Sequence, residues 1–410
     1  MTEGADYGLI GAKLGHSLSP EIHASLGDYR YDLIEIPEEE LKDFLAAGRF
    51  RGLNVTIPYK KAVIPFCDDL TPRARAIGSV NTLMRREDGT LLGDNTDYAG
   101  FMAMVAESGL DPKGKKCLVL GSGGASLTVC AVLYDLGAAN VTVVSRSGEN
   151  HYGNLERHAD AALIVNTTPV GMSPACDASP LASLDGFPAL EGVLDLIYNP
   201  AVTNLMQLAI DRGVPAVNGL TMLVTQAAEA SALWFGTDAR SMPVGAIRRE
   251  LARRAANVVL IGMPGCGKST VGRQLAERIH RPFVDLDAVV REAVGMTPGE
   301  IIRTRGEAAF RDVETEVLRT VADRHGLVIA TGGGAILREE NRRLMRRNGM
   351  IFWLDRPLKD LAVKGRPLSL SRGVEALYAE REPLYRALAH RRIVCNNVAS
   401  ALSQILGGKS

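Results

Sequence analysis

The sequence predicts an α/β protein built on parallel sheets and divided into three lobes. Short runs of β-branched residues alternate along the 410 residues with longer stretches of helical character, the pattern of strands and helices stacked in α/β units. This length also exceeds what one hydrophobic core usually supports. The expected strands form three sets: 7–11, 31–36 and 53–57; 117–120, 141–145, 162–166 and 193–196; and 258–261, 283–286, 327–330, 350–354 and 393–395.

Charge separates the chain into two halves. Residues 1–238 hold 17 Lys and Arg against 29 Asp and Glu, and residues 239–410 hold 30 against 18, so their formal net charges are −12 and +12. Between them, 236–243 is rich in small and turn-forming residues, which indicates a linker. We therefore expect a domain at 1–238 (one lobe of about 1–98 plus 205–238, another of about 99–204), a linker at 239–255 and a domain at 256–410.

Composition narrows the class of protein. With 46% hydrophobic and 23% charged residues, the chain is typical of a soluble globular protein, and its six cysteines lack the spacing of a metal site. No apolar run approaches the roughly 18 residues of a membrane helix, and the acidic N-terminus lacks the features of a signal peptide. We expect a cytoplasmic protein with small-molecule partners and neither nucleic-acid nor membrane partners; the oligomeric state stays open.

A phosphate-binding loop stands out in the basic half. Residues 262–269 match G-x-x-x-x-G-K-S between an expected strand (258–261) and an expected helix (270–279), the context that this motif requires. Its glycines turn backbone N–H groups towards phosphate oxygens, its lysine reaches the β- and γ-phosphates, and its serine completes a Mg²⁺ shell. The expected ATP site comprises Gly262, Gly265, Cys266, Gly267, Lys268, Ser269 and Thr270. Cys266 is either a reactive thiol or a filler side chain that points away from ATP.

Five further motifs follow this loop in order. They are Asp285-Leu-Asp287 at a strand end, Phe310-Arg311 on a helix, Gly332-Gly333-Gly334 after a strand, and Arg366-Pro-Leu with Pro383-Leu-Tyr-Arg386 near the C-terminus. With them, residues 256–408 resemble shikimate kinase. The resemblance implies that Asp287 binds substrate hydroxyls and orients or deprotonates the 3-hydroxyl, that Arg311 and Arg386 bind the carboxylate, and that Gly332–Gly334 lie against the ring. It also implies that Asp285 acts through Mg²⁺ and that Arg366 reaches the phosphates from a lid. The lid region, 358–367, is shorter than in many relatives and lacks a clear counterpart of the arginine that often lies over the adenine.

A glycine-rich turn follows the strand at 117–120 in the acidic half. Gly121-Ser122-Gly123-Gly124-Ala125 is similar to the dinucleotide fingerprint, although Ser126 stands where the third glycine is expected. The next strand ends in Ser145-Arg146-Ser147, where NAD-binding chains carry an acidic residue. A guanidinium and two hydroxyls favour the 2′-phosphate of NADP.

Clusters of hydroxyls and amides lie at strand ends near the N-terminus: 15–20, 54–61, 79–82 and 93–97. Such loops are suited to binding a polyol through directional hydrogen bonds. Alternatively, Ser19-Pro20 is a helix N-cap followed by proline, and the Asn-Thr pairs are turns.

These clusters, with 166–172 and 219–226, resemble shikimate dehydrogenase over residues 7–235. The resemblance implies an α/β substrate lobe facing a Rossmann-like NADP lobe, with Thr167 and Gly219 added to the cofactor site. It also implies that Lys60 protonates the ketone of 3-dehydroshikimate while NADPH delivers hydride, and that Asp97 orients Lys60. Lysine is ordinarily protonated at neutral pH, which suits this role. Lys61, next to it, is expected to be exposed. The other substrate-binding residues would be Ser17, Ser19, Thr56, Asn81, Tyr198 and Gln226.

The two resemblances imply successive reactions, because shikimate is the product of the first reaction and the substrate of the second. We therefore expect a bifunctional enzyme of aromatic amino-acid and chorismate biosynthesis that uses NADPH, ATP and Mg²⁺. One alternative is a quinate/shikimate dehydrogenase that uses NAD, fused to a non-catalytic nucleotide-binding module. A scaffold with two inactive sites is a further alternative, against which the intact Lys60/Asp97 and Lys268/Asp287 sets speak.

Overall fold

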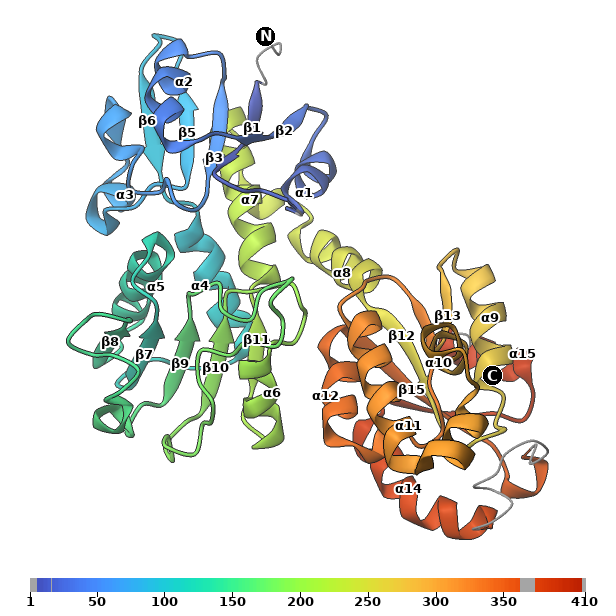
Figure 1. Cartoon of the computed structure of the whole chain (residues 1–410). Helices are drawn as coiled ribbons and strands as arrows, with labels where there is room; N and C mark the ends of the chain where they lie inside the picture. Colours follow the sequence, from blue (N-terminus) through green and yellow to red (C-terminus); the bar gives the residue numbers. More distant parts are fainter. Residues whose placement is uncertain (1–5, 16, 362–372, 408–410) are drawn as a thin grey trace. The chain divides into compact units, whose positions relative to one another are not determined.

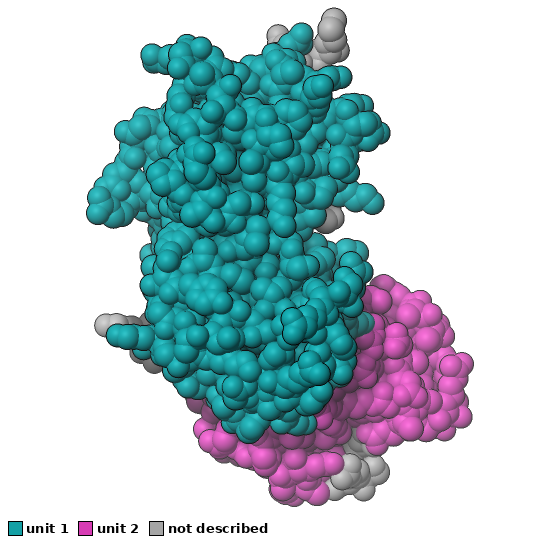
Figure 2. Space-filling model, turned by 90° about the vertical axis from the view of Figure 1, so that its left-hand side faces the viewer, with its two compact units in different colours: residues 1–199, 203–251 teal, residues 200–202, 252–410 magenta. Residues whose placement is uncertain are grey.

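The computed structural model describes residues 6–15, 17–361 and 373–407. It divides into two compact units, residues 1–199 with 203–251 and residues 200–202 with 252–410, which Figure 2 colours separately. The division between 251 and 252 falls inside the linker proposed from the sequence. Among the described residues, no helix combines the length and apolar character needed to cross a membrane.

The first sheet of unit 1 has the strand order β2-β1-β3-β5-β6-β4 (Figure 1). Its strands are β1 (Tyr7–Gly11), β2 (Tyr31–Glu35), β3 (Gly52–Val55), β4 (Asp69–Leu70), β5 (Thr82–Arg85) and β6 (Leu91–Asp94). It is mixed: β5 runs antiparallel to both β3 and β6, although the sequence pattern predicted parallel strands. The reason is a tight turn between β5 and β6, in which the Arg86 N–H bonds the Thr90 carbonyl and Gly89 adopts φ +86°.

The second sheet of unit 1 is wholly parallel, with the order β11-β10-β9-β7-β8. Its strands are β7 (Lys116–Leu120), β8 (Asn140–Val144), β9 (Leu163–Asn166), β10 (Gly192–Asp195) and β11 (Ala216–Asn218). Every residue of β9 and β10 is buried, as expected for strands covered on both faces. The order reverses at β7, so a crevice is expected beyond the carboxyl end of this strand.

The helices of unit 1 are α1 (Ser19–Leu26), α2 (Leu41–Ala47), α3 (Pro72–Ile77), α4 (Asp97–Ser108), α5 (Gly124–Asp135), α6 (Asn204–Asp211), α7 (Leu220–Phe235) and most of α8 (Val244–Ala255). Helices α4 and α7 pack closely, and Gly100 on α4 allows this approach. A Cβ there would lie 2.6 Å from the Met222 carbonyl oxygen on α7. Ile247 and Leu251 of α8 join a buried apolar cluster with Val224 of α7. Part of the proposed linker is therefore an ordered helix that packs on unit 1.

The third sheet, in unit 2, is parallel, with the order β13-β14-β12-β15-β16. The strands are β12 (Asn257–Ile261), β13 (Phe283–Asp285), β14 (Val328–Ala330), β15 (Gly349–Asp355) and β16 (Arg391–Val394). The helices are α9 (Lys268–Arg278), α10 (Leu286–Val294), α11 (Pro298–Ala322), α12 (Glu339–Asn348), α14 (Val374–Leu388) and α15 (Val398–Ile405). Short 3₁₀ helices lie at Glu38–Glu40, Ile64–Phe66, Leu155–His158, Ala239–Ser241, Ala335–Leu337 and Leu358–Asp360.

Local sequence explains where these elements begin and bend. Helix α11 starts with a capping box, in which the Thr297 side chain accepts from the Glu300 N–H and Glu300 bonds the Thr297 N–H. The same helix is kinked at Gly306, whose φ of 89° lies outside the helical region. All twelve expected strands are confirmed, with shifts of one or two residues at their ends, whereas β4, β5, β6 and β11 were not predicted.

Candidate active sites

Lys60 and Asp97 form an ion pair in unit 1. Lys60 lies in the loop after β3 and Asp97 is the first residue of α4, and Lys60 Nζ is 2.5 Å from Asp97 Oδ2. Their side chains are 15% and 7% exposed. Lys61 is exposed, as predicted. The structure thus selects one of two adjacent lysines and holds its ammonium group against a buried carboxylate.

The glycine-rich turn of the second lobe reaches this pair. A Cβ on Gly124, the first residue of α5, would lie 3.0 Å from Lys60 Cβ and 3.1 Å from Ser79 Oγ. Ser79 is fully buried, and its hydroxyl has no hydrogen-bond partner among the described residues. Ser79 belongs to the polar cluster at 79–82, but the sequence alone assigned it no role. Polar side chains of the first lobe therefore lie against the glycine-rich turn of the second lobe.

Buried amides converge behind the ion pair. Asn81 Nδ2 donates to Thr96 Oγ1 at 3.0 Å and to Gln226 Oε1 at 3.4 Å, while Asn81 Oδ1 accepts from the Thr96 N–H at 2.6 Å. Asn81 and Gln226 are 145 positions apart in the sequence. The fold brings them together, with Asn81 bonded to Thr96, the residue before Asp97. Their side-chain hydrogen-bonding groups are therefore held in fixed orientations.

Ser17, Ser19 and Tyr198 form a second polar group. Ser17 Oγ donates to Ser19 Oγ at 3.0 Å. Burial raises the pKa of Tyr198, and a hydrogen bond with the backbone of Leu18 offsets part of this effect, so Tyr198 lies beside the serines. Ser19 is the first residue of α1 and makes no capping hydrogen bond, so the alternative prediction that it is the N-cap is wrong. Thr56, directly after β3, is half-buried.

The glycine-rich turn has the geometry of a dinucleotide loop. Gly121 adopts φ +106°, and a Cβ there would lie 2.8 Å from Thr167 Oγ1, so only glycine fits this close approach. The Thr167 hydroxyl in turn donates to the Leu120 carbonyl at 2.7 Å. Ser122 and Gly123 are exposed ahead of α5, and Ala125 is half-buried within it. Backbone N–H groups at the start of this helix are therefore available to an anion.

Arg146 lies just past the carboxyl end of β8. Arg146 and Ser147 are exposed and Ser145 is half-buried, with the Ser145 N–H bonded to the Asn150 carbonyl at 3.0 Å. Arg146 forms no ion pair with any residue that the structure describes. Its guanidinium is therefore free to bind a phosphate. Gly219, the residue before α7, packs against the Leu196 backbone. A Cβ at Gly219 would lie 2.6 Å from the Leu196 carbonyl carbon.

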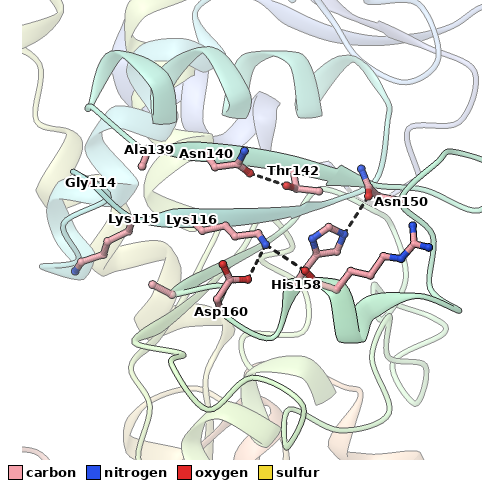
Figure 3. Close-up of a pocket in the computed structure, with 11 residues that line it drawn as sticks. Gly114, Lys115, Lys116, Ala139, Asn140, Thr142, Asn150, His158 and Asp160 are labelled. Atoms are coloured by element: carbon pink, nitrogen blue, oxygen red, sulfur yellow. Dashed lines mark hydrogen bonds and ion pairs between the residues drawn. The ribbon is translucent and has the colours of Figure 1, made fainter.

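A hollow of about 730 Å³ lies at the opposite, amino end of the same sheet (Figure 3). Its two lysines are engaged locally: Lys116 Nζ is 2.6 Å from Asp160 Oδ1, and Lys115 Nζ is 2.5 Å from Glu191 Oε2. His158 bonds Asn150 through Nε2 at 3.0 Å. None of the predicted site residues lines this hollow, so it is distinct from the cofactor loop.

In unit 2, the phosphate loop joins β12 to α9. Gly262, Gly265 and Gly267 have φ of +142°, +84° and +101°. Lys268, which is buried, donates from Nζ to the carbonyls of Gly262 at 2.9 Å and Met263 at 3.0 Å. Its ammonium group therefore lies across the loop. Ser269 and Thr270 follow in the first turn of α9, half-buried and exposed respectively.

Cys266 points into the protein and not into solvent. It is 0% exposed and belongs to the main apolar core of unit 2. Its Sγ would lie 3.1 Å from a Cβ at Gly262, and its carbonyl accepts from Cys395 Sγ at 3.7 Å. This geometry supports the filler alternative over the reactive thiol.

The glycines after β14 are packed against the predicted substrate residues. A Cβ at Gly332 would lie 3.4 Å from Asp287 Oδ1, and one at Gly334 would lie 2.7 Å from Arg311 Cζ. The Gly333 carbonyl accepts from the Tyr385 hydroxyl at 2.5 Å. The structure thus brings Asp287 and Arg311 to one glycine-lined surface.

Ion pairs hold the two predicted carboxylate-binding arginines. Arg311 Nη1 is 2.6 Å from Glu314 Oε2, and burial raises the pKa of Glu314 while Arg311 lowers it in part. Glu314 was not predicted from the sequence, although its i+3 spacing from Arg311 on a helix indicated an ion pair. Arg386 is exposed, and its Nε bonds Glu382 at 2.9 Å on the same helix. Arg366 lies outside the described residues.

This architecture defines an enzyme with two parts: a two-lobed oxidoreductase with a Lys–Asp pair beside a dinucleotide loop, followed by a P-loop kinase. Residues 9–83 match the family model for the shikimate dehydrogenase substrate binding domain, and residues 264–406 match the model for shikimate kinase. The shikimate dehydrogenase (NADP(+)) of Oleidesulfovibrio alaskensis is 42% identical over 270 residues, 60% of this chain and 94% of that protein. The enzyme of the same name from Clostridium perfringens is 38% identical over 251 residues, 56% of this chain and 92% of that protein.

A solved structure agrees with these matches. Shikimate 5-dehydrogenase from Thermus thermophilus, in complex with NADP(H) and shikimate, superposes with a TM-score of 0.53 at 35% identity and covers 60% of this chain and 99% of that chain. The chain belongs to the shikimate dehydrogenase family and carries a shikimate kinase domain at its C-terminal end. It is a bifunctional shikimate-pathway enzyme, and the quinate alternative is not favoured.

Proposed function

We propose that this chain reduces 3-dehydroshikimate to shikimate with NADPH and then phosphorylates the 3-hydroxyl of shikimate with ATP. The observation that carries the first activity is the Lys60–Asp97 ion pair, 2.5 Å long, beside the Gly124 turn. Proton donor and cofactor loop then face the same substrate. The relatives named NADP(+)-dependent shikimate dehydrogenases support this assignment.

In the reduction, Lys60 donates a proton to the ketone oxygen, and Asp97 keeps its ammonium group in place. NADPH, when bound, supplies the hydride. Asn81 and Gln226 are oriented by mutual hydrogen bonds and would bind ring hydroxyls, while Ser17 and Ser19 would bind the carboxylate. Since the amides are already ordered, little side-chain entropy is lost when substrate binds.

NADP is proposed in preference to NAD because of Arg146. Its guanidinium is exposed and forms no ion pair with the described residues, and no carboxylate follows β8 directly to repel a 2′-phosphate. Glu149, three positions after Arg146, is exposed and acidic, so it does not provide a second positive charge for the 2′-phosphate. Selectivity would therefore depend mainly on Arg146, with hydroxyls from Ser145 and Ser147.

In the kinase, Lys268 and the loop backbone would bind the phosphates, and Asp287 would orient the attacking 3-hydroxyl. Arg311 and Arg386 would bind the substrate carboxylate, with Arg366 reaching the phosphates. The Glu314 ion pair keeps Arg311 in position at the glycine-lined surface. Positioning and charge neutralisation provide most of the catalysis in this class of reaction.

Ser269 and Asp285 are of the right chemical type for Mg²⁺, which prefers oxygen ligands. Asp285 Oδ1 caps α10 by accepting from the Asp287 N–H at 3.1 Å, and its second oxygen has no partner among the described residues. A hydroxyl and one available carboxylate oxygen suit a cation that keeps several water ligands. Bound Mg²⁺ would neutralise phosphate charge.

The decisive experiment supplies the full chain with 3-dehydroshikimate, NADPH and ATP–Mg²⁺, and measures NADPH oxidation and shikimate 3-phosphate separately. Lys60→Met should lower the kcat of reduction by roughly 10²–10⁴, the usual scale for a positioned acid, and leave phosphorylation of added shikimate unchanged. Lys61→Met is the matched control. A Lys60→Met enzyme that keeps more than half of its kcat would disprove the role of Lys60.

A further inference from the structure

Arg356 lies beside the phosphate loop of unit 2, at the carboxyl edge of the third sheet. It directly follows β15, which lies beside β12 (Figure 1). In this parallel pair, Trp353 is the partner of Ile261. Arg356 Nη1 is 3.9 Å from the position of a Cβ on Gly267, the residue before Lys268. Ligands of open α/β sheets bind at this edge.

No residue that the structure describes neutralises the charge of Arg356. The preceding carboxylate, Asp355, is bonded by Arg392, whose Nε is 2.8 Å from Asp355 Oδ2. Arg356 makes no hydrogen bond or ion pair with any described residue, and its Nε atom is buried without a partner. A half-buried guanidinium without a counter-ion is costly, because desolvation is not offset.

We propose that Arg356 binds the phosphate chain of the nucleotide in the kinase unit. Guanidinium and phosphate form strong, charge-assisted hydrogen bonds, and an anion at Gly267 would provide the counter-ion that no described residue gives Arg356. This inference rests on the proposed kinase function and adds a residue to its nucleotide site.

The proposed contact acts on ground-state binding. In the proposed function, Lys268, Asp287 and the loop backbone would surround the group that is transferred, whereas Arg356 approaches Gly267 from the end of the neighbouring strand. An interaction of equal strength in the ground state and the transition state raises KM when it is removed and leaves kcat unchanged. Arg356→Gln should therefore raise the KM for ATP.

The test uses the full chain and measures the Kd of ADP, of inorganic tripolyphosphate and of adenosine. Arg356→Gln should weaken ADP and tripolyphosphate by about 10- to 150-fold, the range for a charge-assisted bond to phosphate, and leave adenosine unchanged. Arg356→Lys should restore part of the loss, because it keeps the charge. The kcat for phosphorylation of added shikimate at saturating ATP, which only unit 2 catalyses, checks that unit 2 of each variant is folded.

Arg391→Gln is the matched control, because Arg391 is an exposed arginine on the next strand and its removal changes the net charge equally. Its effect on ADP should stay within about threefold, since exposed charges are screened. Unchanged tripolyphosphate binding in Arg356→Gln, or a loss of affinity confined to adenosine, would overturn the role of Arg356 and leave the proposed kinase function standing. Failure of the wild-type chain to bind ADP would overturn the proposed kinase function as well.

Discussion

His23 provides a test of how burial in unit 1 controls stability. It lies on α1 with 0% exposure, its ring stacks on Tyr31 at 3.9 Å between centroids, and its Nδ1 is 2.6 Å from the Tyr29 hydroxyl. Burial lowers the pKa of His23 from 6.5 to about 3, although the Asn54 side chain offsets part of the shift. His23 is therefore neutral in the folded chain at any pH near neutrality.

The sign and size of the pH dependence follow from this shift. As pH falls below 6.5, the unfolded chain binds a proton at His23 and the folded chain does not, so stability present above pH 6.5 is lost on the way to about pH 3. Each pKa unit corresponds to about 1.4 kcal/mol. Between pH 7 and pH 5, His23 should therefore lower the free energy of unfolding by about 2 kcal/mol.

The assay compares urea unfolding of the wild type and His23→Gln at pH 7 and pH 5, monitored by tryptophan fluorescence. Trp234 lies 5.5 Å from the His23 ring and reports the unit-1 transition. Between pH 7 and pH 5, the free energy of unfolding of His23→Gln should fall by about 2 kcal/mol less than that of the wild type, because all other titrating groups are common to both. His151→Gln, at an exposed histidine, should behave as the wild type. Parallel pH dependences in the wild type and His23→Gln would refute the reasoning.

Three further predictions concern the cofactor site, the phosphate loop and packing. Arg146→Ala should raise the KM for NADPH about 10- to 150-fold more than that for NADH, and equal changes would exclude contact with the 2′-phosphate. Wild type and Cys266→Ala should lose kinase activity at the same rate in a thiol reagent, because Cys266 is 0% exposed; faster loss in the wild type would show a reactive thiol. Gly219→Ala should lower the free energy of unfolding by about 1–3 kcal/mol without cofactor, since its Cβ would meet the Leu196 backbone. Gly186→Ala, where a Cβ meets nothing within 4 Å, is the control, and equal unfolding midpoints would contradict the clash.

Much of the fold was predictable because its signals are local. Alternating apolar runs and turn residues predicted the three strand sets, and the loop at 262–269 needs only a strand, glycines and a helix start in succession. The hairpin of β5 and β6 was missed, because neither strand was among those expected. Its antiparallel direction follows from the short connection at Arg86–Thr90.

The sequence by itself determined which chemical groups are present: a lysine and an aspartate for proton transfer, glycines for phosphate loops and arginines for anions. Only the tertiary structure decided which of them meet. It paired Lys60 with Asp97 and left Lys61 exposed, joined Asn81 to Gln226 across 145 positions, and turned Cys266 into the core. It also bonded Asp355 to Arg392 and placed Arg356 beside Gly267 without an ion-pair partner among the described residues. The physical reason is that an ion pair or hydrogen bond depends on distances of a few ångströms and on desolvation, and packing between distant segments sets both.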